Sequence, residues 1–199
     1  MNRLSFITLL QADLLRQHTL MHSQLESPPS IFRLWLGIAS WRIVPVLLYR
    51  LAHALHNCSL YPLAKAVSMV NFFFFGIEIS ARCPIGPGLF LPHTQGTVIG
   101  AWSIGANATI FQGVTLGARK LDFNYDEFIR PTLKNNVIVG AGAKVLGGVL
   151  LADNSCIGAN SVVLIDVPAG ALAVGLPARI VQYLPETSST NDETNLIAH

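Results

Sequence analysis

The sequence predicts a mainly β protein: a left-handed parallel β-helix of hexapeptide repeats that follows an α-helical region. Three observations predict this fold class. An aliphatic residue recurs every six positions between residues 79 and 168, apart from one extra residue and one longer interruption. Small residues, mostly Gly or Ala, fill many of the positions between them. The mean hydropathy is high, at +0.48, although the chain offers no stretch that suits a membrane span.

The apolar composition first has to be separated from that of a membrane protein. The chain is 51% hydrophobic and only 12% charged, and a spanning helix needs about 20 consecutive apolar residues. The longest stretch without Lys, Arg, Asp or Glu runs from Cys83 to Ala118 and contains three prolines and many glycines, which exclude one long helix. The first residues show no secretory signal, so we expect a cytoplasmic protein.

Cysteines and charge exclude other classes. Cys58, Cys83 and Cys156 are three in number and show no CxxC spacing, which argues against a disulfide framework and against a zinc site. The net charge of +2 comes from scattered Lys and Arg residues, so no basic stripe for nucleic acid is predicted. We expect neither a metal nor a nucleic-acid partner.

The hexapeptide repeat has thirteen aliphatic first positions, with one extra residue, Thr97, before the fourth. Each unit predicts a short strand with its aliphatic residue inward, followed by a turn in which small residues allow positive φ. Three units close a triangular coil, and coils stack about 4.8 Å apart. A β-sandwich or barrel would show period-two alternation instead. The first positions are Ile79, Ile85, Leu91, Val98, Ile104, Ile110, Leu116, Leu133, Val139, Val145, Leu151, Ile157 and Val163.

Residues 119–132, RKLDFNYDEFIRPT, interrupt the repeat and are charged and aromatic. They predict a loop that extends from the β-helix. Loops on rigid scaffolds often carry function, and a tolerated surface insertion is the alternative.

Residues 1–75 predict three or four amphipathic helices, because their apolar residues recur at spacings of three and four. Pro45 is expected to kink or end one of them. His53 and His56 share a helical face, but no third ligand lies nearby in the sequence. The β-helix is predicted over residues 76–181, and the polar residues 182–199 predict a disordered tail.

The helical region is both basic and aromatic. Arg33, Arg42 and Arg50 interrupt its most apolar segment, while Trp35, Trp41 and Phe72 to Phe75 are available for burial. We expect these aromatic residues to pack on one another, on the end of the β-helix or on a sister subunit. Peripheral contact with the inner face of a membrane is the other interpretation.

Six segments between residues 75 and 181 combine the repeat with specific motifs: FGIEI, IGPGLFLPHTQGTVIG, GVTLG, VIVGAGAKVLGG, IGANSVVLIDVP and AVGLPARIV. In these segments the chain resembles the hexapeptide acyltransferase superfamily, and within it the serine acetyltransferases and the related saccharide O-acetyltransferases. The resemblance implies an O-acetyltransferase that uses acetyl-CoA as co-substrate. It also implies a homotrimer, or two trimers joined as a hexamer, with active sites between subunits.

The resemblance implies the catalytic residues. In serine acetyltransferases the motif that matches PHTQG contains the histidine that deprotonates the acceptor hydroxyl, so His93 takes this role. A neutral imidazole is a suitable base near pH 7. The carboxylate that orients the histidine lies in a segment that matches Gly76 to Ile79. Here it is Glu78, where the family has aspartate.

The resemblance also implies where acetyl-CoA binds. Small residues let the pantetheine chain approach the backbone, and cations bind its phosphates. The residues that match such positions are Gly117, Ala118, Ala141, Ala143, Lys144 and Arg179.

Two departures bear on the acceptor. Serine acetyltransferases have an aspartate before the catalytic histidine, where this chain has Pro92, and they end the extended loop with Arg-His-Pro, where this chain has Ile129-Arg130-Pro131. We therefore expect Arg130 and Pro92 to lie at the acceptor, and the acceptor to be a small-molecule or lipid-linked saccharide of exopolysaccharide or capsule synthesis. The alternatives are a serine O-acetyltransferase of cysteine biosynthesis and a non-catalytic β-helix assembly module.

Overall fold

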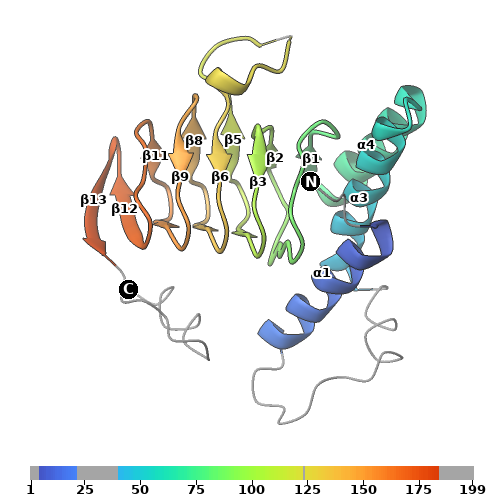
Figure 1. Cartoon of the computed structure of the whole chain (residues 1–199), viewed down its shortest axis with the longest axis horizontal. Helices are drawn as coiled ribbons and strands as arrows, with labels where there is room; N and C mark the ends of the chain where they lie inside the picture. Colours follow the sequence, from blue (N-terminus) through green and yellow to red (C-terminus); the bar gives the residue numbers. More distant parts are fainter. Residues whose placement is uncertain (1–4, 22–39, 123, 184–199) are drawn as a thin grey trace.

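The computed structural model describes residues 5–21, 40–122 and 124–183. Among these residues, three helices come first and cover one end of a three-sided β-helix, which continues to the C-terminal end of the described residues (Figure 1). The expectations for Arg33, for Trp35 and for residues 184–199 of the expected disordered tail lie outside the described residues. The first two residues of that expected tail, Gln182 and Tyr183, instead end the last strand of the β-helix.

The helical region contains α1 (Phe6–Met21), α3 (Ile43–Asn57) and α4 (Tyr61–Phe75), and α3 packs against both of the others. Pro45 lies in the first turn of α3. Because N–H groups of a first turn have no partner within the helix, proline is tolerated there, and the expected kink or end at Pro45 is wrong. Gly76 ends α4 in the left-handed conformation, with φ of 62°, which glycine adopts at little cost.

A buried ion pair joins this region to the first coil of the β-helix. Arg50 Nε lies 2.9 Å from Asp13 Oδ2, and the two side chains are 2% and 0% exposed. Asp13 Oδ1 also accepts hydrogen bonds from the N–H groups of Gly88 and Leu89, while Arg50 donates to carbonyl oxygens of Ile85 and Gly86. The Asp13 carboxylate oxygens and the Arg50 guanidinium nitrogens are therefore all hydrogen-bonded, as a buried ion pair requires.

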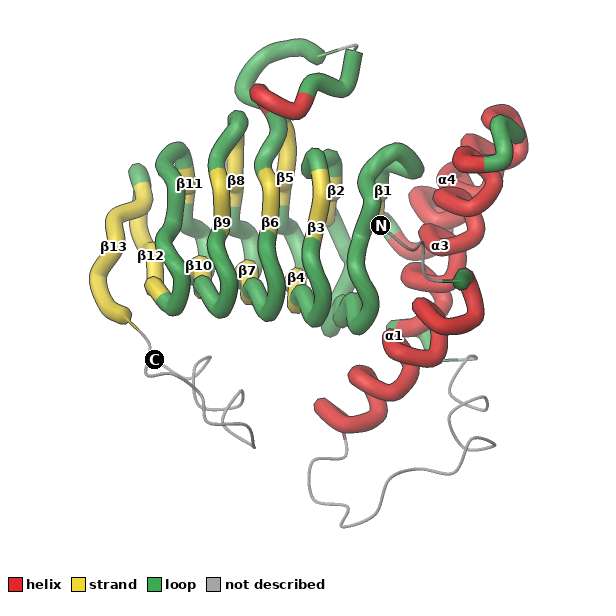
Figure 2. Tube along the Cα trace, in the orientation of Figure 1, coloured by secondary structure: helices red, strands yellow, loops and turns green. Residues whose placement is uncertain are grey.

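The β-helix has three faces, and each is a sheet whose strands come from successive coils (Figure 2). All neighbouring strands are parallel except β12 and β13, which close the C-terminal end as an antiparallel pair. The mainly β, left-handed β-helical fold class is thereby confirmed. Face A contains β1 (Ile77–Ile79), β2 (Thr97–Ile99), β5 (Thr115–Gly117), β8 (Lys144–Leu146) and β11 (Val162–Val163). Face B contains β3 (Ser103–Ile104), β6 (Thr132–Leu133) and β9 (Leu150–Leu151). Face C contains β4 (Thr109–Ile110), β7 (Ile138–Val139), β10 (Cys156–Ile157), β12 (Ala171–Gly175) and β13 (Ala178–Tyr183).

The core of the β-helix is built from the repeat's first positions. Twelve of the thirteen predicted residues are buried, but Val98 is 36% exposed and the inward residue of its coil is Ile99, 1% exposed. Ile99 pairs with Ile79 and Leu116, whereas Val98 pairs with outward residues of the neighbouring strands. The predicted register is therefore wrong at this one unit, because both candidate residues are aliphatic and the coil is longer than eighteen residues.

Left-handed residues stack in columns at the turns. Asn107, Asn136 and Asn154 have φ between 57° and 60°, which asparagine tolerates better than other residues with a side chain. Their side chains form a ladder, with Asn107 Nδ2 3.1 Å from Asn136 Oδ1 and Asn136 Nδ2 3.0 Å from Asn154 Oδ1. The turns are thus stabilised from coil to coil outside the core as well as inside it.

The aromatic end of α4 is only partly buried. Phe75 packs against the core, but Phe72, Phe73 and Phe74 are 53%, 71% and 77% exposed. Phe72 and Phe73 lie against each other, with ring centroids 5.6 Å apart, so the expected packing of these side chains on one another is observed for one pair. Burial of the exposed side chains against a sister subunit stays a prediction. None of the described helices has the length and apolar character needed to cross a membrane.

Candidate active site

His93 lies in the turn of residues 91–96, which leads from face C to β2 on face A, and its side chain is exposed. Two hydrogen bonds hold this turn against the end of α4. Thr94 Oγ1 donates to Phe75 O at 2.7 Å, and the N–H of Gly96 donates to Gly76 O at 2.9 Å. The backbone around His93 is therefore fixed to the segment that continues directly into β1.

Glu78 is the middle residue of β1. Ile77 and Ile79 on either side of it point into the core, so its side chain points outward on face A and is exposed. The structure brings Glu78 and the His93 turn onto adjoining coils, since β1 pairs with the strand that follows this turn. Although both residues are described, no hydrogen bond or ion pair joins their side chains in the single chain.

Two residues of the helical region lie against the same turn. The Trp41 and His93 rings are 5.7 Å apart, centroid to centroid, with planes inclined by 33°. Arg42 Nε donates to Pro92 O at 3.2 Å, and its guanidinium carbon lies 4.3 Å from the centre of the Trp41 ring. Sequence reasoning missed both residues as members of the site, because about fifty positions separate them from His93 and no motif connects them.

The predicted acetyl-CoA positions follow face A away from Glu78. In register, the outward residues run from Glu78 through Val98 and Thr115 to Lys144. Three steps of about 4.8 Å place Lys144 about 14 Å from Glu78. We call this row of outward-facing residues the track.

The predicted small residues flank this track. Gly117 ends β5, and a Cβ there would meet no atom within 4 Å, so the backbone is open to a ligand. Ala118 and Ala141 are half-buried at the two edges of face A. Ala143 is different: it is 0% exposed and packs in the core one position before Lys144. Its expected contact with the cofactor is therefore wrong, because it has no accessible surface.

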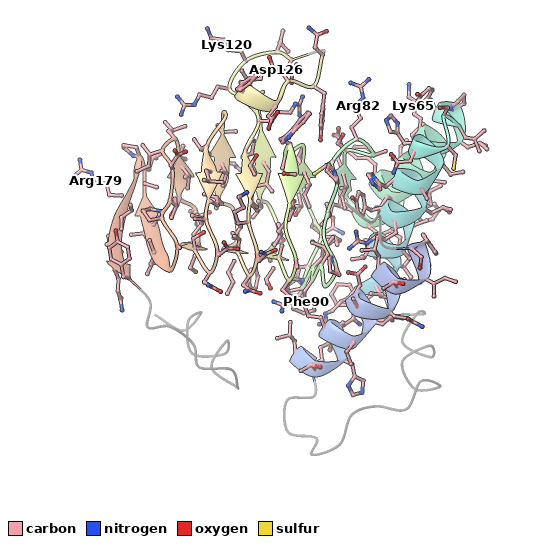
Figure 3. The ribbon with its side chains drawn as sticks, viewed as in Figure 1. Lys65, Arg82, Phe90, Lys120, Asp126 and Arg179 are labelled. Carbon is pink, nitrogen blue, oxygen red and sulfur yellow. The ribbon has the colours of Figure 1, made fainter. Side chains whose placement is uncertain are left out.

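The two predicted phosphate ligands differ in their surroundings. The ammonium of Lys144 donates a short hydrogen bond to Gly113 O, so it is held at the edge of face A. Arg179 lies on β13, exposed at the far end of the β-helix from the helical region (Figure 3). A ligand that reached from His93 to Arg179 would run along most of the length of the β-helix.

Arg130 is engaged inside the loop that joins β5 to β6. Its Nε lies 2.5 Å from Asp122 Oδ2, and its Nη1 donates to Gly100 O at 2.7 Å. Its third nitrogen donates to Asp122 O at 3.4 Å, and its guanidinium carbon lies 4.1 Å from the Tyr125 ring centre. Within a single chain Arg130 therefore closes the loop, and the structure does not bring it to the turn that carries His93.

Asp122 organises the same loop. Its oxygens accept hydrogen bonds from the N–H groups of Asn124, Tyr125 and Asp126. Burial raises the pKa of the Asp122 carboxyl, but the hydrogen bonds from Arg130 and from the backbone N–H groups outweigh it, so the pKa lies below its ordinary value. The loop projects from the β-helix, and its 3₁₀ turn (Glu127–Ile129) carries Phe128, which is 84% exposed (Figure 1).

Tyr125 connects the loop to the first coils. Its hydroxyl donates to Ala101 O at 2.6 Å, and the guanidinium carbons of Arg82 and Arg130 lie 5.8 and 4.1 Å from its ring centre. Its φ is 62°, which is strained for an aromatic residue. The strain shows that this conformation is imposed by its surroundings. In the part of the chain that the structure describes, no three His, Cys, Asp or Glu residues gather as a metal site.

Comparison with known proteins adds three findings. A family model described as bacterial transferase hexapeptide (six repeats) matches residues 130–164. The serine acetyltransferase of Helicobacter pylori strain J99 is 44% identical over 159 residues, which cover 79% of this chain and 91% of that protein. The serine acetyltransferase of Bacillus subtilis strain 168 is 45% identical over 134 residues, or 67% of this chain and 60% of that protein.

Solved structures agree with these sequence matches. The crystal structure of Neisseria gonorrhoeae serine acetyltransferase superposes with a TM-score of 0.78 at 28% identity, covering 92% of this chain and 68% of that one. Soybean serine acetyltransferase complexed with serine superposes with a TM-score of 0.74 at 31% identity, covering 89% and 70%. These similarities favour serine, the alternative acceptor, and the expected saccharide acceptor finds no support in them.

Proposed function

The chain belongs to the serine acetyltransferases, acetyltransferases of the hexapeptide family, and we propose that it transfers the acetyl group of acetyl-CoA to the hydroxyl of L-serine. The observation that carries this proposal is the 44% identity that extends over 91% of the Helicobacter pylori enzyme. It is supported by the exposed His93, held in a fixed turn at the edge of face A. Serine acetyltransferase thereby replaces saccharide acetyltransferase as the preferred interpretation.

In this mechanism His93 removes the proton from the serine hydroxyl as the oxygen attacks the thioester carbonyl carbon. The carbon–sulfur bond then breaks, and the proton passes from the imidazolium to the departing sulfur, which leaves O-acetylserine and CoA. A positioned base of this kind typically raises the reaction rate by about 10² to 10⁴-fold. Glu78 stabilises the imidazolium that forms, which requires its side chain to turn from open solvent on face A toward His93.

Acetyl-CoA is proposed to lie along face A, with the thioester toward His93. Gly117, Ala118 and Ala141 border the track and present little side-chain bulk. Lys144 lies within the same track, whereas Arg179 lies on β13 of face C, at the far end of the β-helix. Both cations are proposed to contact the phosphates, with Lys144 using the donors that Gly113 O leaves free.

A homotrimer is proposed to complete the site. In the single chain His93 is exposed, and the loop carries apolar side chains that contact little of their own chain: Leu121 is 86% exposed and Phe128 84%. A neighbouring subunit's loop that covers His93 would bury these side chains and exclude water from the reaction. Light scattering that shows a stable monomer with full activity would overturn the trimer.

The acceptor is tested by following thiol release from acetyl-CoA. The purified full chain is assayed with L-serine, and in parallel with nucleotide sugars and with purified capsule glycans as acceptors. We expect rapid thiol release with L-serine at millimolar concentration, and O-acetylserine as the product by mass spectrometry. Turnover of a glycan without turnover of serine would overturn the proposed function and restore the saccharide interpretation.

A further inference from the structure

The helical region supplies a cation at the turn that carries His93. Arg42 Nε is bonded to the carbonyl of Pro92, the residue immediately before His93, and Trp41 places its ring against the imidazole. These contacts join a residue pair at the start of α3 to the proposed catalytic base. Neither residue belongs to the hexapeptide repeat.

The remaining hydrogen-bonding capacity of Arg42 is large. Its Nε donates to Pro92 O, and its Nη1 makes only a weak 3.5 Å contact with Met21 Sδ. Within the described residues, Nη2 makes no hydrogen bond and no carboxylate pairs with the guanidinium. Arg42 is therefore half-buried and charged beside the site, and it has no counter-ion among the residues that the structure describes.

The predicted acceptor ligand is occupied elsewhere. All three guanidinium nitrogens of Arg130 donate hydrogen bonds, to Asp122 and to Gly100 O. The Asp122 carboxylate already balances its charge. Binding a second carboxylate there would require the loop's central ion pair to break. Arg42 has no such competitor.

We propose that Arg42 binds the carboxylate of the amino-acid acceptor and that Trp41 holds its guanidinium in place. This inference rests on the proposed function, because it needs an acceptor with a carboxylate. In serine only a few bonds separate the hydroxyl from the carboxylate, so the groups that hold the two ends must be neighbours. The bond from Arg42 to Pro92 O, one residue from His93, meets this condition.

The chemistry of the pair suits the task. A guanidinium offers several donors in one plane and binds a carboxylate through two parallel hydrogen bonds. The Trp41 ring, 4.3 Å from the guanidinium carbon, restrains that plane by a cation–π contact. The Arg42 guanidinium is anchored at the Pro92 carbonyl, the position where serine acetyltransferases carry an aspartate.

The inference is tested by comparing L-serine with L-serinamide, which keeps the hydroxyl and the amino group but lacks the negative charge. The measured quantity is the ratio of kcat/KM for the two acceptors, at saturating acetyl-CoA. For the unmodified protein we expect a ratio of at least about 10, the size of one charge-assisted hydrogen bond. In Arg42→Ala we expect the ratio to approach 1, because the KM for serine rises and its kcat/KM falls.

Two further variants separate binding from folding. Arg42→Lys keeps the charge without the planar donors, so an intermediate ratio is expected. Trp41→Ala leaves Arg42 in place but unrestrained, so we expect a raised KM for serine and an unchanged KM for acetyl-CoA. Lys65→Ala, which removes an exposed cation of the same helical region on α4 (Figure 3), is the control and should leave the ratio unchanged.

The outcomes distinguish the two proposals. Failure of the unmodified protein to acetylate serine overturns the proposed function and this inference with it. Rapid serine turnover, together with a serine-to-serinamide ratio that is unchanged in both Arg42→Ala and Arg42→Lys, overturns the role of Arg42 alone. The same ratio can be read from any variant with residual activity, so partial loss of folded protein does not obscure it.

Discussion

Arg130 Nε lies 2.5 Å from Asp122 Oδ2, and this ion pair closes the base of the loop between β5 and β6. The two residues are eight positions apart, and several of the loop's other contacts involve one of them. Asp122 accepts hydrogen bonds from three backbone N–H groups. Arg130 donates a hydrogen bond to Gly100 O on the β-helix and stacks on the Tyr125 ring. The loop is thus an ordered projection whose shape is set largely by one carboxylate.

Replacing Asp122 by Ala should therefore open the loop. The strained Tyr125 would lose the hydrogen bond from its N–H to Asp122. The backbone at Arg119 and Lys120, whose side chains are already exposed at the loop's start, would gain the local freedom that trypsin cleavage needs. We expect cleavage after these two residues to be faster by at least about tenfold, since cleavage follows the population of the open form. Arg130 precedes a proline, so it adds no trypsin site.

Asp126→Ala is the matched control for this experiment. Asp126 also caps a backbone N–H, that of Phe128, but it makes no ion pair with Arg130. The Asp126→Ala variant should accelerate trypsin cleavage far less than Asp122→Ala. Equal cleavage rates in the two variants would show that the Asp122–Arg130 pair does not order the loop.

The loop should also respond to pH. Because the folded pKa of Asp122 lies below the ordinary value of 3.8, its contribution to loop stability is fully present above that ordinary value. It is lost as the pH falls through the lowered folded pKa. Hydrogen-exchange protection of the Asn124, Tyr125 and Asp126 amides should be constant from pH 7 to about 5 and fall only below about pH 4. In Asp122→Asn this acid transition should be absent, and a transition near neutral pH would contradict the assignment.

The repeat could be predicted from the sequence because each coil carries its own signal. An inward aliphatic residue every six positions defines both the strand and its direction, and residues from Leu133 to Val163 follow that rule without exception. Val98 and Ile99 show its limit. Where coil length changes, two adjacent aliphatic residues satisfy the pattern equally well, and only pairing with Ile79 and Leu116 decides between them.

Contacts between distant segments could not be predicted in this way. Nothing near Trp41 or Arg42 in the sequence indicates that they meet the His93 turn, because that contact depends on how α3 docks on the end of the β-helix. Arg130 illustrates the converse. Its place in a motif suggested acceptor binding, but its guanidinium forms an ion pair with Asp122, eight residues away. Ala143 likewise matched a family position, although the register turns it inward.

The docking of the helical region should depend on Asp13. Replacing Asp13 by Ala leaves the buried Arg50 charge unpaired and the N–H groups of Gly88 and Leu89 without acceptors. We expect the free energy of unfolding to fall by about 3–5 kcal/mol, measured from urea denaturation. Lys65→Ala, on the exposed surface of α4, should leave the denaturation midpoint unchanged.

A double variant makes this prediction sharper. For an isolated buried pair, replacing both partners by apolar residues often restores stability. Here Asp13→Leu with Arg50→Met would still leave four backbone groups of the first coil unpaired, at residues 85, 86, 88 and 89. We expect no recovery, and stability equal to the unmodified protein would show that these backbone bonds contribute little.

The three free thiols should react very differently in the folded protein. Cys58 is exposed, whereas Cys83 and Cys156 are buried. Burial raises the pKa of the Cys83 thiol to about 12 and also raises the pKa of Cys156, so at pH 8 neither forms much thiolate. We expect a disulfide reagent such as DTNB to label one thiol rapidly and the other two only after unfolding. Cys58→Ser should abolish the rapid phase, and a rapid phase that survives this change would place a second thiol at the surface.

His93 and Glu78 are the proposed base and the carboxylate that supports it. Thr94 and Gly96 hold the His93 backbone against the end of α4, but no side-chain bond orients the imidazole toward Glu78 in the single chain. His93→Ala removes the base and should lower kcat by at least about 10²-fold, with the KM for acetyl-CoA unchanged.

Glu78 should matter through its charge rather than its length. Glu78→Gln keeps the shape but cannot stabilise an imidazolium, whereas Glu78→Asp keeps the charge and restores the residue that serine acetyltransferases carry. We expect kcat to fall by about tenfold or more in Glu78→Gln, roughly one unit of 1.4 kcal/mol, and by much less in Glu78→Asp. A Glu78→Gln variant with full kcat would leave His93 acting without a carboxylate. Its orientation would then have to come from Trp41, the ring that the structure already places 5.7 Å away.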